Sequence, residues 1–161
     1  MNGHTRVNCC DDLFTKFTFQ DLRSALPPNR KGVYVIRVKK EGSSVRQIVK
    51  QAKQLLQNLK WELVQNYILN RIRRLERIRQ CPIVYIGSAG TQKHSKNTLK
   101  GRYREFSLRH TAMYPIWALL YFNWDLEFGW RETEDPGRVE SQLKQQYKER
   151  HGNRLPAIVQ E

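Results

Sequence analysis

A chain of 161 residues that is 39% hydrophobic and 11% aromatic is large enough to form one domain with a buried core, which excludes wholesale disorder. No apolar run approaches a bilayer span, and the N-terminus lacks the apolar core of a signal peptide, so we expect a soluble, cytoplasmic protein with no membrane partner. The net charge of +14 predicts a polyanionic partner, and nucleic acid is the first candidate.

Three cysteines, Cys9, Cys10 and Cys81, occur in the chain without CxxC spacing. An odd number without that spacing predicts neither a disulfide framework nor a zinc site. His4 lies near Cys9 and Cys10 in the sequence, but no second pair of ligands accompanies them, so a metal site there is the weaker interpretation.

Residues 1–31 are interpreted as an N-terminal extension, in which FTKFTFQDLRSAL alternates aromatic and polar residues before the loop sequence PPN. A short strand and a short helix both fit this pattern. Residues 32–39, GVYVIRVK, are apolar and β-branched and predict the first strand of the main domain, which spans 32–161.

Residues 45–80 contain neither glycine nor proline, and apolar residues recur in them at steps of three and four. This period predicts an apolar stripe along one helix of about 50 Å or along a bent helical hairpin. The whole segment 41–80 carries nine basic and three acidic residues, which fits either a solvated face or DNA contact. We predict a helical insertion at 41–80 that serves dimer contact or groove recognition, with Arg71 and Arg74 among its DNA contacts.

The rest of the chain alternates strands and helices. Pro82 ends the insertion, and residues 83–86 predict a second strand that stops at Gly87. Residues 98–110 predict a basic helix, and residues 115–122 form an apolar element of undecided type.

Residues 125–135 predict a third strand, and Asp135 with Pro136 predicts the start of a last helix. Together these elements predict an α/β fold with a small central antiparallel three-stranded sheet flanked by helices, and with the helical insertion between its first two strands. Antiparallel pairing of the first two strands would bring Tyr34 and Tyr85 close together.

Short motifs in these elements resemble those of the GIY-YIG nucleases. Gly32-Val33-Tyr34 is similar to the first signature, with valine for the usual isoleucine, and Tyr85-Ile86-Gly87 matches the second. The segment from Leu99 to Arg102 resembles the one that presents the family's catalytic arginine. Glu140 matches its metal-binding glutamate, and Asn153 resembles the asparagine that follows. The resemblance covers 32–40 and 83–156 and leaves the long segment 41–80 as an insertion.

The resemblance implies a metal-dependent DNA endonuclease that hydrolyses phosphodiester bonds, with Tyr34, Tyr85, Arg102, Glu140 and Asn153 as catalytic residues. Tyr34 is the implied general base, and Glu140 is the implied ligand of one Mg²⁺ or Mn²⁺ per active site. The small size favours a type II restriction enzyme acting on double-stranded DNA, for which a homodimer would supply one site per strand.

Each residue type suits this chemistry. Arg102 could clamp phosphate with its fixed fork of donors, and Glu140 could hold a hard divalent cation. Buried tyrosines must place their hydroxyl groups in polar surroundings, where they could orient or deprotonate water. Taken singly, these residues are ordinary surface or core residues, and only their ordered set favours catalysis.

The family often has histidine one turn after its arginine, where this chain has Phe106, and the nearest histidines are His94 and His110. The loop residues Lys93, His94 and Lys96 could approach the phosphate, and contact with the DNA backbone is favoured over catalysis. Lys100 and Arg104, on the predicted basic helix, are further predicted DNA contacts.

Two other functions remain open from the sequence. One is a non-catalytic nucleic-acid-binding module that kept the fold and lost the chemistry. The other is a nuclease of the same family that acts on branched or damaged DNA. Charge alone does not separate these alternatives, because each predicts salt-sensitive DNA binding.

Overall fold

Four strands and five α-helices make up the described part of the chain. The computed structural model describes residues 10–91, 97–106 and 113–159. In chain order the elements, with η for 3-10 helices, are η1 (Asp11–Phe14), β1 (Thr18–Asp21), β2 (Gly32–Lys40), α1 (Val45–Leu56), α2 (Glu62–Ile72), η2 (Arg73–Arg77), β3 (Ile83–Ala89), α3 (Leu99–Phe106), α4 (Met113–Tyr121), β4 (Asp125–Glu132) and α5 (Pro136–Arg150).

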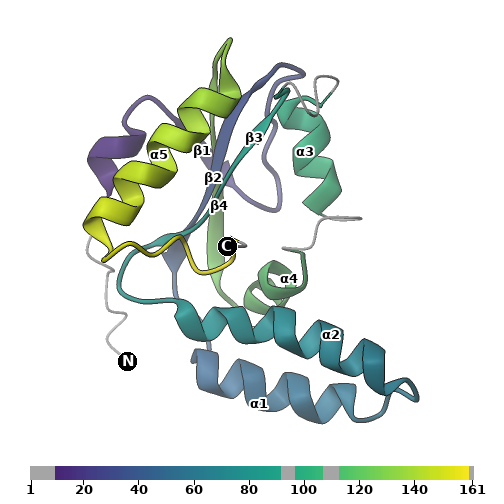
Figure 1. The fold of residues 1–161 in the computed structure, drawn as a ribbon. Helices are drawn as coiled ribbons and strands as arrows, with labels where there is room; N and C mark the ends of the chain where they lie inside the picture. The colour runs from purple at the N-terminus through teal and green to yellow at the C-terminus, as the bar shows by residue number, and fades with distance from the viewer. Residues whose placement is uncertain (1–9, 92–96, 107–112, 160–161) are drawn as a thin grey trace.

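The strands form one sheet in the order β1-β4-β2-β3, and all neighbouring pairs are antiparallel (Figure 1). The prediction of a three-stranded sheet is therefore wrong. The extra strand, β1, comes from the predicted N-terminal extension and pairs with β4 from Thr18↔Trp130 to Asp21↔Glu127. Without β1 the backbone groups along that side of β4 would be an open edge, and pairing with β1 satisfies them.

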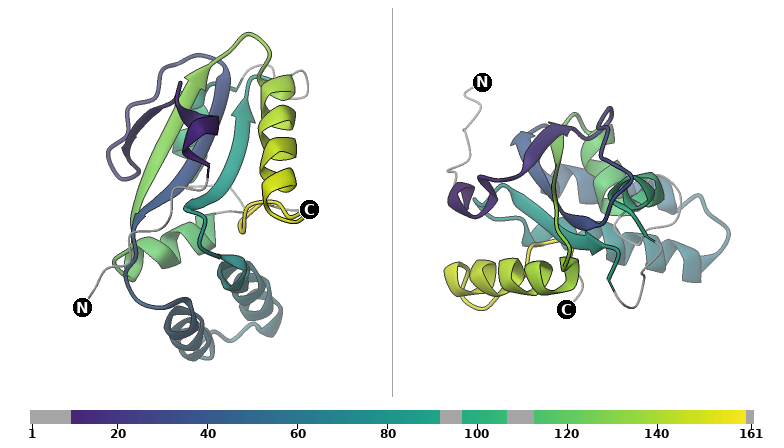
Figure 2. Two further views of the ribbon diagram at one scale, coloured as in Figure 1. Left: turned by 90° about the vertical axis from the view of Figure 1, so that its left-hand side faces the viewer. Right: turned by 90° about the horizontal axis from the view of Figure 1, so that it is seen from above.

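Side chains alternate along β2 between two cores. Val33 and Val35 pack with Leu143 and Tyr147 of α5, whereas Tyr34 and the next alternate residues pack on the opposite face. Figures 1 and 2 show α5 on one side of the sheet and α3 and α4 on the other. The sheet is consequently buried on both faces, which explains why β2 is almost continuously apolar.

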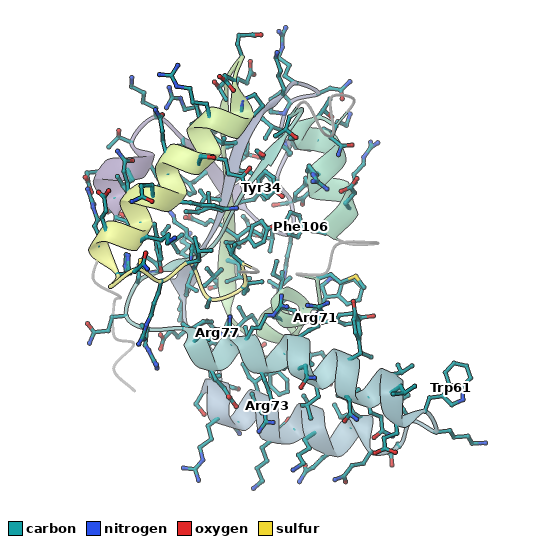
Figure 3. All side chains as sticks on the ribbon, viewed as in Figure 1. Tyr34, Trp61, Arg71, Arg73, Arg77 and Phe106 are labelled. Carbon is teal, nitrogen blue, oxygen red and sulfur yellow. The ribbon has the colours of Figure 1, made fainter. Side chains whose placement is uncertain are left out.

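The helical insertion is a hairpin of α1 and α2, which lie side by side beyond one end of the sheet (Figure 1). Helix α1 begins at Ser44, whose side chain accepts a hydrogen bond from the Gln47 backbone amide at 3.2 Å. Trp61 lies in the turn at the tip of the hairpin (Figure 3). Ile48 and Leu75 are completely buried in the core, so the insertion is packed into the domain.

The end of the second strand differs from expectation, and the type of the undecided apolar element is now decided. The second strand does not stop at Gly87 but continues to Ala89, because Gly87 is paired with Tyr34 inside the β2–β3 ladder. The undecided apolar element is α4, with Ile116 and Leu119 buried in the core. No helix among the described residues is both long and apolar enough to cross a membrane.

We expect Leu75→Ala to lower the free energy of unfolding by about 2–5 kcal/mol, because it leaves a cavity where η2 meets the core. Leu63→Ala is the matched control, since Leu63 is 85% exposed on α2, and should change stability by less than about 0.5 kcal/mol. Urea unfolding followed by circular dichroism measures both. Equal effects of the two variants would contradict the packing of the insertion into the core.

Candidate functional site

Two stacked phenol rings lie between the sheet and α3. The ring centroids of Tyr34 and Tyr85 are 5.8 Å apart with planes 18° from parallel. Tyr34 is 1% exposed, whereas Tyr85 is only partly buried. Phe106 of α3 packs edge-on against both rings, with each centroid 5.6 Å away (Figure 3 labels Tyr34 and Phe106). Of the two phenols, Tyr85 is therefore the one that solvent or a ligand can reach.

Gly87 makes room for these rings. A Cβ atom at Gly87 would lie 2.6 Å from both Cζ and the hydroxyl oxygen of Tyr34, and 2.9 Å from Cε1 of Tyr85. Tyr34 is the cross-strand partner of Gly87, so its ring lies over the glycine backbone. The glycine of the second tripeptide is thus required by close packing, and it does not end the strand.

The surroundings of both phenols disfavour their ionised form. Burial raises the pKa of Tyr34 well above its ordinary value, and the neighbouring Tyr85 raises it further. Burial also raises the pKa of Tyr85, while its hydrogen bond with Tyr34 lowers it. Ionisation of Tyr85 is therefore opposed less strongly than ionisation of Tyr34.

Arg102 reaches the phenols from α3. The helix begins at Thr98, whose hydroxyl accepts a hydrogen bond from the Gly101 amide at 3.1 Å. Nη1 of Arg102 donates to Glu105 at 2.7 Å, and its buried Nε has no hydrogen-bond acceptor among the described residues. Burial lowers the pKa of Arg102, but the bond to Glu105 and the charges of Glu105 and the two phenols together leave the pKa raised. The guanidinium stays charged, and its side chain is 21% exposed.

Glu140 approaches from the other side of the sheet. Helix α5 starts at Asp135, whose side chain accepts from the Arg138 amide at 3.3 Å, and this places Glu140 in the second turn. Oε1 of Glu140 accepts from Nζ of Lys144 at 2.5 Å, and Oε2 accepts from the hydroxyl of Ser88 on β3. The Glu140 carboxylate is therefore held against β3 and is about one-fifth exposed, with 20% of its side chain accessible.

These groups meet around β3, which is an edge strand of the sheet. The two phenols and Arg102 lie on one face of β3, whereas Glu140 and Ser88 lie on the face covered by α5. The charge of Arg102 lowers the pKa of both Tyr34 and Tyr85, whereas the charge of Glu140 raises both pKa values. Four predicted site residues from separate elements thus form one electrostatic group, which we call the β3 cluster: Tyr34, Tyr85, Arg102 and Glu140.

The donors at Glu140 fit a hard divalent cation. The Glu140 carboxylate and the Ser88 hydroxyl both offer oxygen, the ligand atom that Mg²⁺ and Mn²⁺ prefer. The Lys144 ammonium now contacts this carboxylate, but its long, partly exposed side chain can move away from it. Glu140 and Ser88 are accordingly the residues that would hold such an ion.

Not every predicted site residue joins the β3 cluster. Asn153 lies beyond the opposite end of α5 from Glu140, exposed and in the left-handed region with φ of 64°. Its backbone amide donates to the Lys148 carbonyl as part of the turn that ends the helix. The placement does not support the catalytic role implied for Asn153 by the resemblance.

The predicted DNA contacts lie in different places. Lys100 and Arg104 are exposed on α3, the helix that carries Arg102. The guanidinium of Arg71 lies 4.8 Å from the centre of the Tyr67 ring on α2. Lys93, His94 and Lys96, and also His110, lie outside the described residues.

A groove of about 950 Å³ separates η2 from the C-terminal tail, away from the β3 cluster. It is lined by residues from the start of β3 and the end of α5, whereas the β3 cluster lies at the end of β3 and the start of α5. Burial and the nearby charges of Arg71 and Arg77 lower the pKa of Arg74, which marks a concentration of positive charge. The basic groove is defined by five arginines with one glutamate: Arg73, Arg74, Arg77, Arg79, Arg154 and Glu76.

Sequence analysis missed Ser88 and Lys144 as partners of Glu140. Both had a local signal: Ser88 directly follows Tyr85-Ile86-Gly87, and Lys144 lies four residues after Glu140 on the same helix face. Phe106 was noted only as the residue in place of histidine, and its contact with both phenols required the tertiary structure.

Comparisons of the chain with protein-family models, with curated proteins and with solved structures found no match. The function is therefore inferred from the geometry and charges described above.

We expect Tyr34→Phe to reduce the loss of stability at alkaline pH. An unfolded tyrosine ionises near pH 10, whereas the raised pKa of Tyr34 keeps it neutral in the folded state. The stability that the raised pKa of Tyr34 contributes to the folded state is therefore complete below about pH 10, and it falls by about 1.4 kcal/mol per pH unit above that value. Guanidinium unfolding between pH 8 and pH 11 measures this slope.

Tyr121→Phe is the control for this measurement, because Tyr121 is 75% exposed. Its slope should equal that of the wild type. If Tyr34→Phe also kept the wild-type slope, the burial of the Tyr34 phenol in solution would be disproved.

Proposed function

We propose that this protein is a metal-dependent endonuclease of the type II restriction kind, which hydrolyses double-stranded DNA in the cytoplasm. The observation that carries the proposal is the β3 cluster, in which two phenols, a guanidinium and a carboxylate from four elements act on one another at an edge strand. The order of these residues along the chain, and the GIY-YIG resemblance it carries, adds support.

Arg102 is the residue suited to hold the scissile phosphate. Its guanidinium is charged, and its Nε has no acceptor among the residues described. A phosphate oxygen could accept from the exposed part of the guanidinium, whose side chain is 21% exposed, and negative charge that builds on the phosphoryl group would be stabilised by the fixed guanidinium. The bond to Glu105 holds the side chain in this orientation.

Tyr85 is the phenol suited to act on the attacking water. Tyr34, the base implied by the resemblance, is buried beneath Tyr85 and Phe106. Burial raises the pKa of Tyr34 well above its ordinary value, so its phenol stays neutral. Tyr85 is partly exposed, and its hydrogen bond with Tyr34 lowers its pKa against the effect of burial. We therefore assign general-base action to Tyr85, with Tyr34 as a positioning residue behind it.

Glu140 completes the site. A bound Mg²⁺ or Mn²⁺ ion would neutralise charge on the phosphate and the leaving oxygen. Glu140 and Ser88 orient this side of the site, and Lys144 balances the carboxylate when no ion is held.

The basic groove supports DNA as the substrate. His151, which lines the groove, lies about 16 Å from Glu140, taking about 1.5 Å per residue along α5. This span corresponds to about five base pairs at about 3.4 Å each. A duplex cut at the β3 cluster could therefore also place backbone phosphates against the arginines of the groove.

We expect Glu140→Gln to reduce cleavage of plasmid DNA in Mg²⁺ by about 100-fold or more while DNA affinity changes little. Glutamine keeps the shape of the side chain and removes its charge. Glu149→Gln, an exposed change on the same helix, is the control and should cut at the wild-type rate. Gel analysis of cleavage and fluorescence anisotropy of binding separate the two effects.

The same assay distinguishes the phenols, because Tyr85→Phe should lose more activity than Tyr34→Phe if Tyr85 is the base. A wild-type protein that binds DNA but cuts none with Mg²⁺ or Mn²⁺ would instead favour the non-catalytic binding module. Phe106 in place of histidine and Lys144 against Glu140 are the features that favour that alternative. Cleavage of branched DNA alone would indicate the repair-type nuclease.

Cutting both strands requires two sites, and an exposed apolar surface suits a second copy of the chain. An apolar groove of about 310 Å³ lies between α1 and α4, with Leu55 61% exposed and Tyr121 75% exposed on its rim. Exposed apolar grooves of this kind mark interaction sites. We therefore propose a homodimer formed through this surface.

We expect light scattering at micromolar concentration to give the mass of two chains. Leu55→Glu should shift the protein toward monomer, because it introduces charge into the apolar groove. Leu26→Glu is the control, since Leu26 is 81% exposed in the loop after β1 and away from this surface. A monomeric wild type, or equal effects of both variants, would contradict this interface.

A further inference from the structure

Two cysteines and a histidine meet at the base of the basic groove. Cys10 precedes η1, Cys81 precedes β3, and His151 follows the last residue of α5. One ligand atom from each of the three residues lies within 4.8 Å of the others, and both cysteines are buried. No short sequence motif joins them, because Cys10 and Cys81 are 71 positions apart.

The separation of the thiols suits a shared tetrahedral ion. The Sγ atoms of Cys10 and Cys81 are 3.8 Å apart. Two thiolates that each bind Zn²⁺ at about 2.3 Å in tetrahedral geometry are themselves about 3.8 Å apart. A disulfide needs about 2.05 Å, so the same two residues would have to move before they could form one.

The histidine is oriented for metal binding. Its Nδ1 lies 2.6 Å from the Tyr147 carbonyl oxygen, which can only accept, so Nδ1 carries the proton. Nε2 then carries the lone pair that a metal needs. The Tyr147 ring stacks on the imidazole with centroids 3.8 Å apart and fixes its plane. A carbonyl partner on the far nitrogen is the usual second-shell arrangement of a metal-bound histidine.

Arg150 provides positive charge beside Cys10. Its guanidinium is within hydrogen-bonding reach of the Cys10 sulfur and is held by Asp12 through two bonds of 2.6 Å.

We propose that Cys10, Cys81 and His151 bind one Zn²⁺ ion, with water as the fourth ligand. Thiolate and imidazole ligands select zinc over Mg²⁺, so this site differs in chemistry from Glu140 as well as in place. The ion would join three segments that are distant in the sequence: the N-terminal segment, the start of β3 and the end of α5. Because Cys81 and His151 also line the basic groove, the ion would hold the base of that groove rigid. The proposal does not depend on nuclease activity.

The test uses the purified wild-type chain. Elemental analysis should find one zinc per chain, and removal of the zinc by a chelator should lower the midpoint of thermal unfolding, with recovery on adding Zn²⁺. Replacement by Co²⁺ should produce thiolate charge-transfer and tetrahedral d–d absorption. Absence of zinc together with no effect of added Zn²⁺ or Co²⁺ would overturn the proposal.

Cys81→Ala and His151→Gln should each weaken zinc binding by about 100-fold or more. Leu143→Ala, in the same core cluster, is the control, because it should lower stability and leave the zinc content unchanged. Zinc bound equally well by Cys81→Ala would show an adventitious site. A Cys10–Cys81 disulfide found by mass spectrometry in protein purified without reductant would also contradict it.

Discussion

The pairing of Tyr34 with Gly87 across β2 and β3 is the constraint on which the site depends. The phenol ring occupies the space that a side chain at 87 would fill, and Tyr85 stacks on its outer side. A one-residue change of register would move each tyrosine to the opposite face of the sheet. The close fit of the Tyr34 ring over a residue without a Cβ atom opposes such a change, because a larger side chain opposite Tyr34 would clash with the ring. The same contacts that stabilise the core therefore position the phenols.

Burial gives the two phenols different properties. Tyr34 lies deeper, and burial raises its pKa further than that of Tyr85, so Tyr34 remains neutral. Phe106 excludes water from the inner ring, where histidine would have provided a second polar group. A site built in this way relies on an incoming cation or on Arg102 to favour the tyrosinate form of Tyr85, because the low-dielectric surroundings oppose it.

Helix α5 links the two proposed sites of the molecule. Its first turns hold Glu140 against Ser88, and its last residues bring Tyr147 and His151 to the basic groove. Since α5 packs along the sheet through Leu143 and Tyr147, the two ends keep a fixed separation. The helix can thus set the distance between the proposed cutting site and the groove proposed to hold the flanking DNA, with the proposed zinc ion fixing the end of the helix farthest from Glu140.

The sequence by itself determined the local elements. The β-branched run of β2, the helix start at Asp135, and the three- and four-residue spacing of the insertion each predict structure, because they depend on neighbours along the chain. Only the tertiary structure decided the fourth strand, the burial of Tyr34, the distance of Asn153 from Glu140, and the meeting of Cys10, Cys81 and His151. These depend on which distant segments pack together, and a side chain's exposure and partners are set by that packing and not by its sequence neighbours.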